Sequence, residues 1–276
     1  MLLRCADKTL DLSSPVVMGV LNVTPDSFSD GGRFADVEAA VAHGLAMAAA
    51  GAALIDVGGE STRPGAAPVS APEELRRVIP VIASLAAATA AVISVDTSKP
   101  EVMQAAAAAG AGLINDVQAL RSPGALEAAA ASGCAVCLMH MQGEPRTMQL
   151  APQYADVFAE VRAFLAARAA ACRAGGIADT RLVIDPGFGF GKTVEHNLTL
   201  LRRLGELARD GLPVLVGLSR KSMLGTLTQR GPGERTAGSV ALAVVAALGG
   251  ARIVRAHDVA PTVDALRVVA AVQGGR

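Results

Sequence analysis

The sequence predicts an α/β protein built as a (β/α)8 (TIM) barrel in a single domain, with a short N-terminal β element. Three observations support this fold class. Eight short apolar runs recur along the 276 residues, Ala-rich segments of helical composition separate them, and nearly every run ends in polar or glycine-rich sequence. Strands buried on both faces of a parallel sheet are almost continuously hydrophobic, and one barrel needs a chain of about this length. An open doubly wound sheet is the alternative, but it usually needs fewer regular units.

The predicted strands follow one another between residues 16 and 259. They are VVMGVLNVT (16–24), ALIDVGGE (53–60), AVISVDT (91–97), GLINDV (112–117), AVCLMH (135–140), LVIDPG (182–187), PVLVGLS (213–219) and IVRAHDV (253–259). Residues 1–12 precede them, and we expect a small β element there that plugs the bottom of the barrel. Because no linker or fixed repeat interrupts the pattern, we expect residues 1–276 to form one domain.

Signals for helix ends lie between the strands. Ser70 and Ser98 stand three residues before Glu73 and Glu101, which is the spacing of a capping box. The glycines at positions 51, 110 and 133 follow helical patterns and suit left-handed C-caps. Residues 78–95 form an uncharged stretch of 18, but they include a proline and carry Ala where a membrane span would carry Leu. We interpret this stretch as a helix end followed by a buried strand.

Composition argues against several kinds of partner. Basic and acidic residues number 25 each, and no long basic run stands out, so we expect no nucleic-acid partner. The chain shows neither a membrane span nor a secretory leader, and its four cysteines then fit the reducing cytoplasm better than a disulfide framework. We therefore expect a cytoplasmic protein.

Polar side chains collect at one end of the predicted strands. The C-terminal ends of all eight strands converge in a (β/α)8 barrel, and catalytic groups lie there. The candidates are Asn22, Asp56, Asp96, Asn115, Asp116, His140, Asp185, Ser219, Arg255, His257 and Asp258. A single carboxylate in an apolar strand would usually be structural, because its burial is costly without a partner. A set at the same end of every strand indicates a functional site.

Two loops add cations and hydroxyl groups at this end. STRPG (61–65) follows the second strand and offers a guanidinium that can bind a carboxylate or a phosphate. SRKS (219–222) follows the seventh strand and places two cations at the rim. Arg255 and His257 are two residues apart on one strand, so both can face the same side. With Asn22 as an oxygen ligand, this group suits a diphosphate and Mg2+, which prefers oxygen ligands and keeps several waters.

Two other motifs fail on inspection. GFGFGKT (187–193) resembles a phosphate-binding loop, but the pattern requires Gly at position 186, where this chain has Pro186. The same stretch lacks the glycine spacing of a dinucleotide site. Cys134 and Cys137 have CxxC spacing, but they lie in an apolar run and have no second pair to complete a zinc site, so we expect core thiols.

Several polar residues also have a structural interpretation. His140, between two methionines, suits a structural histidine as well as a ligand. We expect Asp116 and Asp258 to anchor backbone near the strand ends. We also expect Glu60 to hold the following loop through its amides, and His196 to lie on a helix surface or in a loop.

Taken together, the motifs resemble one family. GVLNVTPDSFSDGG (19–32), DVGGESTRPGA (56–66), SVDTSKP (94–100), INDV (114–117), DPGFGFGKT (185–193), GLSRKSMLG (217–225) and RAHDV (255–259) are similar, in the same order, to the motifs of the dihydropteroate synthases. The resemblance covers essentially the whole chain. It implies a homodimer that requires Mg2+ and condenses (7,8-dihydropterin-6-yl)methyl diphosphate with 4-aminobenzoate. The products would be 7,8-dihydropteroate and diphosphate, in folate biosynthesis, and sulfonamides would compete with aminobenzoate.

The resemblance also implies a role for each matching residue. The pterin would be held by Asp96, Asn115, Asp185, Lys221 and Arg255. The diphosphate would be held by Asn22, Thr62, Arg63, Arg255 and His257, with Asn22 also bound to the metal. The aminobenzoate would lie near Thr62, Arg63, Pro64, Phe190, Lys221 and Ser222. The catalytic set would be Asp96, Asp185, Lys221, Arg255 and His257.

These roles suggest a dissociative mechanism. Mg2+, Arg255 and His257 would stabilise the departing diphosphate, while Asp96 and Asp185 would stabilise positive charge on the pterin methylene. An aromatic amine is neutral at pH 7 and needs no strong base before it attacks. We expect the loops at residues 24–34 and 61–70, which contain Gly and Pro, to close over the substrates.

Two alternatives share the pterin site. A barrel that transfers a methyl group from methyltetrahydrofolate to a corrinoid has no use for a diphosphate site, which Asn22, Arg255 and His257 would supply. A non-catalytic paralogue should lose residues at the rim, and none of the expected residues is lost.

Overall fold

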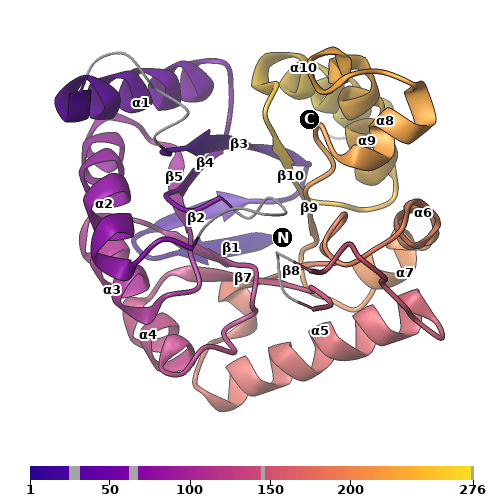
Figure 1. Ribbon diagram of the computed structural model, residues 1–276, viewed down its shortest axis with the longest axis horizontal. Helices are drawn as coiled ribbons and strands as arrows, with labels where there is room; N and C mark the ends of the chain where they lie inside the picture. Colours follow the sequence, from indigo (N-terminus) through magenta and orange to yellow (C-terminus); the bar gives the residue numbers. More distant parts are fainter. Residues whose placement is uncertain (25–31, 62–67, 144–146, 275–276) are drawn as a thin grey trace.

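A computed structural model of the chain describes residues 1–24, 32–61, 68–143 and 147–274, without the side chains of residues 32–35. Eight parallel strands form a barrel, and helices surround it (Figure 1). The strands are β3 (Val16–Asn22), β4 (Leu54–Gly58), β5 (Val92–Asp96), β6 (Leu113–Asp116), β7 (Ala135–Met139), β8 (Leu182–Asp185), β9 (Leu215–Val216) and β10 (Ile253–Ala256). Each lies inside one of the predicted apolar runs, so the predicted fold class is confirmed.

The barrel is closed unevenly. The hydrogen-bonded order is β8-β7-β6-β5-β4-β3-β10-β9, which leaves β8 and β9 to complete the ring. They meet only through an isolated bridge between Ile184 and Val214, with the Ile184 N–H donating to the Pro213 carbonyl at 3.0 Å. Proline has no N–H to donate, which limits the ladder at this point. The ring therefore closes through a narrow seam between β8 and β9.

The helices form an outer ring around the strands (Figure 1). They are α1 (Gly32–Ala49), α2 (Ala71–Ala88), α3 (Pro100–Ala108), α4 (Ala125–Ser132), α5 (Val157–Ala174), α6 (Val194–Arg202), α7 (Leu204–Ala208), α8 (Ser222–Thr228), α9 (Thr236–Leu248) and α10 (Val259–Val272), with short 3-10 helices at Asp179–Arg181 and Pro232–Glu234. The uncharged stretch 78–95 divides between α2 and β5, as predicted. Among the described residues, none of the helices combines the length and hydropathy needed to cross a membrane.

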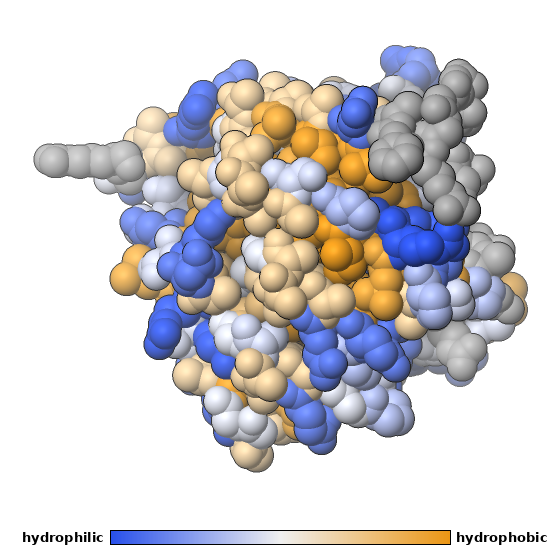
Figure 2. Space-filling model, turned by 90° about the vertical axis from the view of Figure 1, so that its left-hand side faces the viewer, coloured by the Kyte–Doolittle hydropathy of each residue, from blue (hydrophilic) through white to orange (hydrophobic). Residues whose placement is uncertain are grey.

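The side of the molecule that carries α1, α2 and α3 exposes an extended apolar surface in its upper half (Figure 2). Half-buried side chains of α1 and α2 pack against the main core, among them Val41, Leu45, Leu75 and Ile79. The sheet-facing sides of the same helices are fully buried, as at Ile82. The helices thus bury one face against the strands and cover each other along their flanks.

Both predicted capping boxes are wrong, although the predicted glycine caps are confirmed. Ser70 is the N-cap of α2 but makes no side-chain cap hydrogen bond, and the hydroxyl of Ser98 donates to the buried Asp116 instead. A capping box forms between Thr193 and His196 at the start of α6, with both bonds at 3.2 Å. The glycines at 51, 110 and 133 have φ of 97°, 102° and 75°. At Ser98, a tertiary partner therefore overrides the local signal for a helix cap.

The N-terminal β element plugs the barrel bottom, as predicted. Antiparallel strands β1 (Leu2–Cys5) and β2 (Lys8–Asp11) form a hairpin across the far end of the barrel in Figure 1. Leu3, Cys5 and Leu12 belong to one buried apolar cluster with residues from all eight barrel strands, which are Met18, Leu54, Val92, Leu113, Ala135, Cys137, Val183, Leu215 and Ile253. Cys134 and Cys137 are buried free thiols, as expected. This apolar layer supports the functional end above it.

Candidate active site at the strand ends

The inward side of the barrel changes from apolar to polar along the strands. Successive inward positions on a strand lie two residues apart. Two residues beyond the apolar layer come Asp56, Ser94, Asn115, Asp185 and Arg255, and Asp96 follows Ser94 at the next inward position. The strand register places Asn22 opposite Gly58, Gly58 opposite Asp96, and Asp96 opposite Asn115. Period-two alternation therefore brings residues far apart in sequence to one end of the barrel.

Arg255 bridges two carboxylates at the centre of this end. Its Nε donates to Asp56 Oδ2 at 2.7 Å, and its Nη2 donates to Asp96 Oδ2 at 3.0 Å. The fully buried Asp56 also accepts from Ser94 Oγ at 2.6 Å and from Asn115 Nδ2 at 2.9 Å. These charge-assisted bonds link β4, β5, β6 and β10 into one network.

Residues at the ends of strands β8, β9 and β10 and in the loops that follow form the opposite side of the site. Asp185 Oδ1 accepts from the backbone N–H of Gly187 at 2.7 Å. Lys221, which follows β9, places its ammonium 4.1 Å from the centre of the Phe190 ring. The Nδ1 atom and backbone N–H of His257 lie 3.1 Å and 3.2 Å from Ser219 Oγ. Phe190 and Lys221 thus form a partly apolar, partly cationic wall beside the carboxylates.

The loop after β8 is held by a buried lysine. Lys192 Nζ donates to the carbonyls of Gly187 at 2.9 Å, Phe190 at 3.0 Å and His140 at 3.3 Å, and lies 3.0 Å from His140 Nδ1. A side chain on Gly187 would overlap the His140 carbonyl, so the loop needs glycine there. Burial, together with the nearby Lys192, lowers the pKa of His140 to about 3. His140 is therefore a neutral structural residue.

The other structural predictions have mixed outcomes. Asp116 accepts from the backbone N–H groups of Gln118 and Leu120, both at 2.8 Å, as predicted. Asp258 instead pairs with a side chain, because Arg220 donates to it through Nη2 at 2.6 Å and Nε at 3.1 Å. The hydrogen bond from Arg220 holds the pKa of Asp258 below its usual value. Asp258 thus fixes the cationic turn after β9.

Glu60 holds the loop after β4, as predicted. Its Oε1 accepts from the Val69 N–H at 3.2 Å, and its Oε2 pairs with Lys99. Lys99 also pairs with the fully buried Glu74 at 2.5 Å. Burial lowers the pKa of Lys99, but its hydrogen bonds to the two glutamates outweigh burial and leave the pKa raised. The loop is therefore anchored at both of its described ends.

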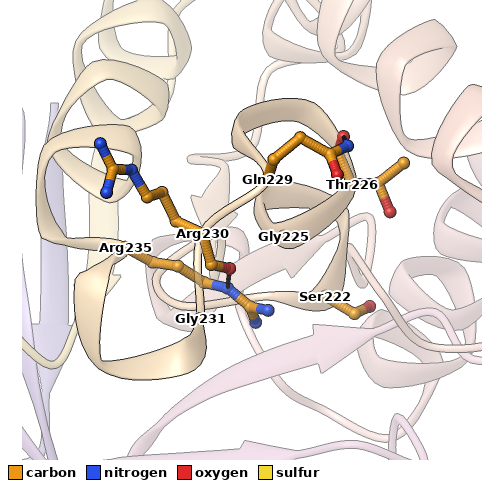
Figure 3. Close-up of a pocket in the computed structure, with 7 residues that line it drawn as sticks. All are labelled: Ser222, Gly225, Thr226, Gln229, Arg230, Gly231 and Arg235. Atoms are coloured by element: carbon orange, nitrogen blue, oxygen red, sulfur yellow. Dashed lines mark hydrogen bonds between the residues drawn. The ribbon is translucent and has the colours of Figure 1, made fainter.

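Some predicted residues cannot be placed. Thr62, Arg63 and Pro64 lie outside the described residues, as does most of the predicted closing loop at 24–34. Ser222 is described, and it lies exposed at the start of α8 beside a surface pocket of about 570 Å³. In Figure 3 the guanidinium of Arg235 extends toward Ser222. Arg235 Nε donates to the Arg230 carbonyl at 3.2 Å, which fixes the edge of this pocket.

Comparison with known proteins places this arrangement in a family. The pterin binding enzyme family model matches residues 18–257. The dihydropteroate synthase of Escherichia coli strain K12 is 59% identical over 263 residues, which cover 95% of this chain and 93% of that protein. The chain belongs to the dihydropteroate synthase family.

Solved structures of dihydropteroate synthases share the fold closely. The chain is similar to the Xanthomonas albilineans dihydropteroate synthase with 4-aminobenzoic acid, with 59% identity, a TM-score of 0.94, and coverage of 100% of this chain and 99% of that one. It is also similar to the Xanthomonas albilineans enzyme in complex with 7,8-dihydropteroate, with 56% identity, a TM-score of 0.91 and full coverage of both chains.

Burial shifts the acid–base properties of this dihydropteroate synthase family site. Desolvation, together with the charge of the neighbouring Asp56, raises the pKa of Asp96 to about 7. Desolvation also raises the pKa of Asp185 to about 6 and lowers the pKa of Lys221 to about 8. Burial, helped by Arg255, lowers the pKa of His257 to about 4, so this imidazole is neutral at pH 7.

No functional role was predicted from the sequence for two residues of the site. Asp56 stood among the polar strand residues but received no role, and Lys192 was noticed only as part of a failed phosphate-loop motif. A carboxylate inside an apolar strand signals that partners must exist. The partners of Asp56 lie on three other strands, and nothing local in the sequence identifies them.

Proposed function

We propose that this protein condenses (7,8-dihydropterin-6-yl)methyl diphosphate with 4-aminobenzoate, giving 7,8-dihydropteroate and diphosphate in folate biosynthesis. The observation that carries this proposal is the polar strand-end network of a chain 59% identical to a dihydropteroate synthase. Its buried carboxylates accept hydrogen bonds, its lysine and arginine donate them, and an aromatic ring lies beside them. We further propose a cytoplasmic location, because all four cysteines are free thiols.

The carboxylates suit the pterin. The amino-pyrimidinone edge of a pterin offers adjacent N–H donors, which Asp185 or Asp96 can accept in charge-assisted bonds. Asn115 can present its amide oxygen, because its Nδ2 is bound to Asp56. Lys221, which lies close enough to Asp185 for the two charges to interact, can donate to ring acceptors. We assign these residues and Arg255 to pterin binding.

The diphosphate and metal fit the top of β3 and β10. A side chain on Gly58 would lie 3.5 Å from Asp96 Cβ and 3.9 Å from Asn22 Oδ1, so the missing side chain keeps this space open. Among the described residues, no group of three or more His, Cys, Asp and Glu could hold a metal. A lone Asn22 oxygen suits Mg2+, which binds phosphate oxygens and water beside one or two protein ligands. Bound Mg2+ would neutralise charge on the leaving diphosphate.

Arg255 and His257 would complete the diphosphate site with Thr62 and Arg63. Arg255 supplies positive charge, and the neutral His257 can donate one hydrogen bond from the ring nitrogen that is not directed at Ser219. Because both act on charge that develops in the leaving group, they would lower the barrier more than they strengthen substrate binding.

The second substrate would bind at the rim. Phe190 and Lys221 offer a ring face and a cation for the aromatic amine. Ser222 would add a hydroxyl, and Thr62, Arg63 and Pro64, which lie outside the described residues, would complete this part of the site. The amine is neutral at pH 7 and needs no general base. We therefore propose a dissociative substitution, in which Asp96 and Asp185 stabilise positive charge on the pterin methylene before the amine attacks.

We also propose that the protein is a homodimer. Exposed apolar side chains gather on neighbouring helices α9 and α10, where Val245 is 49%, Leu248 55%, Val268 64% and Val272 77% exposed. Large exposed apolar side chains that gather on neighbouring helices are typical of a protein interface. The proposed interface is this α9–α10 surface.

One assay tests the reaction. Purified protein is given the pterin diphosphate and Mg2+, and diphosphate release is followed with and without 4-aminobenzoate. We expect release that depends on aminobenzoate, together with formation of dihydropteroate. A protein that binds the pterin but releases no diphosphate would contradict the synthase proposal, and methyl transfer from methyltetrahydrofolate to a corrinoid would replace it.

A further inference from the structure

Asp56 lies beneath the site rather than in it. Its carboxylate is fully buried, two residues below Gly58 on β4, and it accepts hydrogen bonds from three donors on three other strands. Oδ1 accepts from Ser94 Oγ, and Oδ2 accepts from both Asn115 Nδ2 and Arg255 Nε. Because its oxygens are taken up by protein donors, any effect of Asp56 on a ligand must act through these neighbours.

The first effect concerns the orientation of the Asn115 amide. An asparagine amide carries a donor at one atom and an acceptor at the other, and it can turn to offer either to a ligand. Asp56 is the ion-pair partner of Arg255 and therefore a carboxylate that can only accept. It holds Nδ2 of Asn115 at 2.9 Å, so Oδ1 faces away from Asp56 and accepts no hydrogen bond from the described residues.

The second effect concerns the guanidinium plane of Arg255. With Nε on Asp56 and Nη2 on Asp96, the group is fixed at two points along one edge. A planar fork held at two points keeps its face in one direction and loses little entropy when a ligand stacks on it. Asp56 therefore shares in fixing both a hydrogen-bonding group and a stacking surface.

We propose that Asp56 is a positioning residue that sets the donor and acceptor pattern of the pterin site. By binding the Asn115 amide nitrogen, it leaves the amide oxygen for the ligand, so the site selects a ligand with an N–H group at that point. This inference rests on the proposed pterin-binding function and deepens it. It explains why a carboxylate is buried in β4, where an apolar residue would cost less.

The isosteric variant Asp56→Asn separates charge from geometry. Its amide oxygen can take the place of Oδ2 and accept from Asn115 and Arg255, while its amide nitrogen donates to Ser94 Oγ, since a hydroxyl can also accept. Ser94→Ala leaves Asp56 with two equivalent acceptor oxygens. Asp56→Ala removes the acceptor of the Asn115 amide nitrogen, so the Asn115 amide is free to turn, while Arg255 keeps its hydrogen bond to Asp96.

The readout is the affinity ratio between two ligands. One is 6-hydroxymethylpterin, and the other is its lumazine counterpart, in which the 2-amino donor is replaced by a carbonyl acceptor. The wild-type protein should prefer the pterin, because an acceptor facing the Asn115 oxygen leaves two acceptors in contact. Calorimetry with each ligand gives the ratio, and circular dichroism checks that each variant is folded.

The three variants should differ in a specific way. Asp56→Asn and Ser94→Ala should keep the pterin-to-lumazine affinity ratio within about threefold of the wild-type ratio, whereas in Asp56→Ala the ratio should fall by about tenfold, which corresponds to one hydrogen bond. Folded Asp56→Ala protein that keeps the wild-type ratio would overturn the positioning role, and so would a tenfold loss in Ser94→Ala. Wild-type protein that binds neither ligand would instead overturn the proposed function.

Discussion

The ammonium of Lys221 lies 4.1 Å from the centre of the Phe190 ring, although the two residues follow different strands. This cation–π contact joins the loops after β8 and β9, and it holds a lysine whose pKa is lowered to about 8, chiefly by burial. An interaction of this kind contributes about 0.5–2 kcal/mol.

Replacing Phe190 by Leu should weaken binding of the second substrate. We expect the KM for aminobenzoate to rise by about three- to thirtyfold, because both the ring face and the anchored position of Lys221 are lost. Phe190→Tyr should remain close to wild type, since it keeps the aromatic face. Steady-state kinetics with each substrate varied in turn separates this effect from pterin binding, and an equal rise in the KM for the pterin would contradict it.

The pH dependence of activity should be bell-shaped. Pterin N–H donors bind ionised carboxylates, so affinity should increase as pH rises through about 6 for Asp185 and about 7 for Asp96. It should fall again as Lys221 loses its proton above about 8. We expect the highest kcat/KM for the pterin between about pH 7 and pH 8. Because these charged groups interact, the apparent pKa values of the profile describe the three groups together. Asp96→Asn should move the acid limb of the profile to about pH 6. An acid limb that does not move would show that ionisation of Asp96 does not control it.

Removing the ammonium of Lys192 should loosen the loop after β8. Lys192→Met removes the hydrogen bonds from the ammonium to three carbonyls, which should lower the free energy of unfolding by about 2–3 kcal/mol in urea titrations. The KM for aminobenzoate should also rise, because one of these carbonyls belongs to Phe190. Lys8→Met is the matched control, since Lys8 donates to the carbonyls of Ala91 at 2.9 Å and Thr89 at 3.3 Å at the other end of the barrel. It should cost stability but leave the KM unchanged.

The pair Lys99–Glu74 allows stability and loop anchoring to be separated. Lys99→Met strands the buried Glu74 carboxylate, and we expect a loss of about 3–5 kcal/mol in the free energy of unfolding. Lys99→Met/Glu74→Leu should recover most of this loss, because an apolar pair can replace a buried ion pair. The KM for aminobenzoate should rise in both variants, because Glu60, which holds the loop after β4, loses Lys99 as its partner. Full recovery of the KM in the double variant would contradict the anchoring role.

Charge placed on the α9–α10 surface should break the proposed dimer. Val268→Glu puts a carboxylate at a 64% exposed position that the interface would bury. Sedimentation velocity should then show monomers where the wild type shows dimers. Leu150→Glu, at an 82% exposed position in a loop, should leave the assembly unchanged. If wild-type protein sediments as a monomer, the proposal is wrong.

The fold could be predicted from the sequence because its signals are local. An apolar run such as that around β5 identifies a buried strand, and period-two alternation then places Ser94 and Asp96 on the inward side. Reliance on local signals also explains why the two capping boxes were predicted wrongly. Ser98 has the spacing of a cap, but its hydroxyl reaches Asp116, which comes 18 residues later in the chain.

The network beneath the site could not be predicted in the same way. Asp56 and Arg255 are 199 residues apart in sequence, and only the closed ring brings them within 2.7 Å. Lys192 resembled a phosphate ligand, because a local motif does not show that its ammonium is enclosed by carbonyls. Pairings between distant strands decide which polar residues face a ligand and which hold the others in place.

The seam between β8 and β9 gives the barrel wall an uneven stiffness. From β3 to β6 the strands are joined by continuous ladders, and this arc carries Asn22, Asp96 and Asn115. The loops with Phe190 and Lys221 leave the ring on either side of a junction with a single bridge. Thermal motion should therefore separate the strands first beside the proposed aminobenzoate site, while the arc under the proposed pterin site keeps its shape. The barrel would thus combine a rigid floor for one substrate with a more deformable wall for the other.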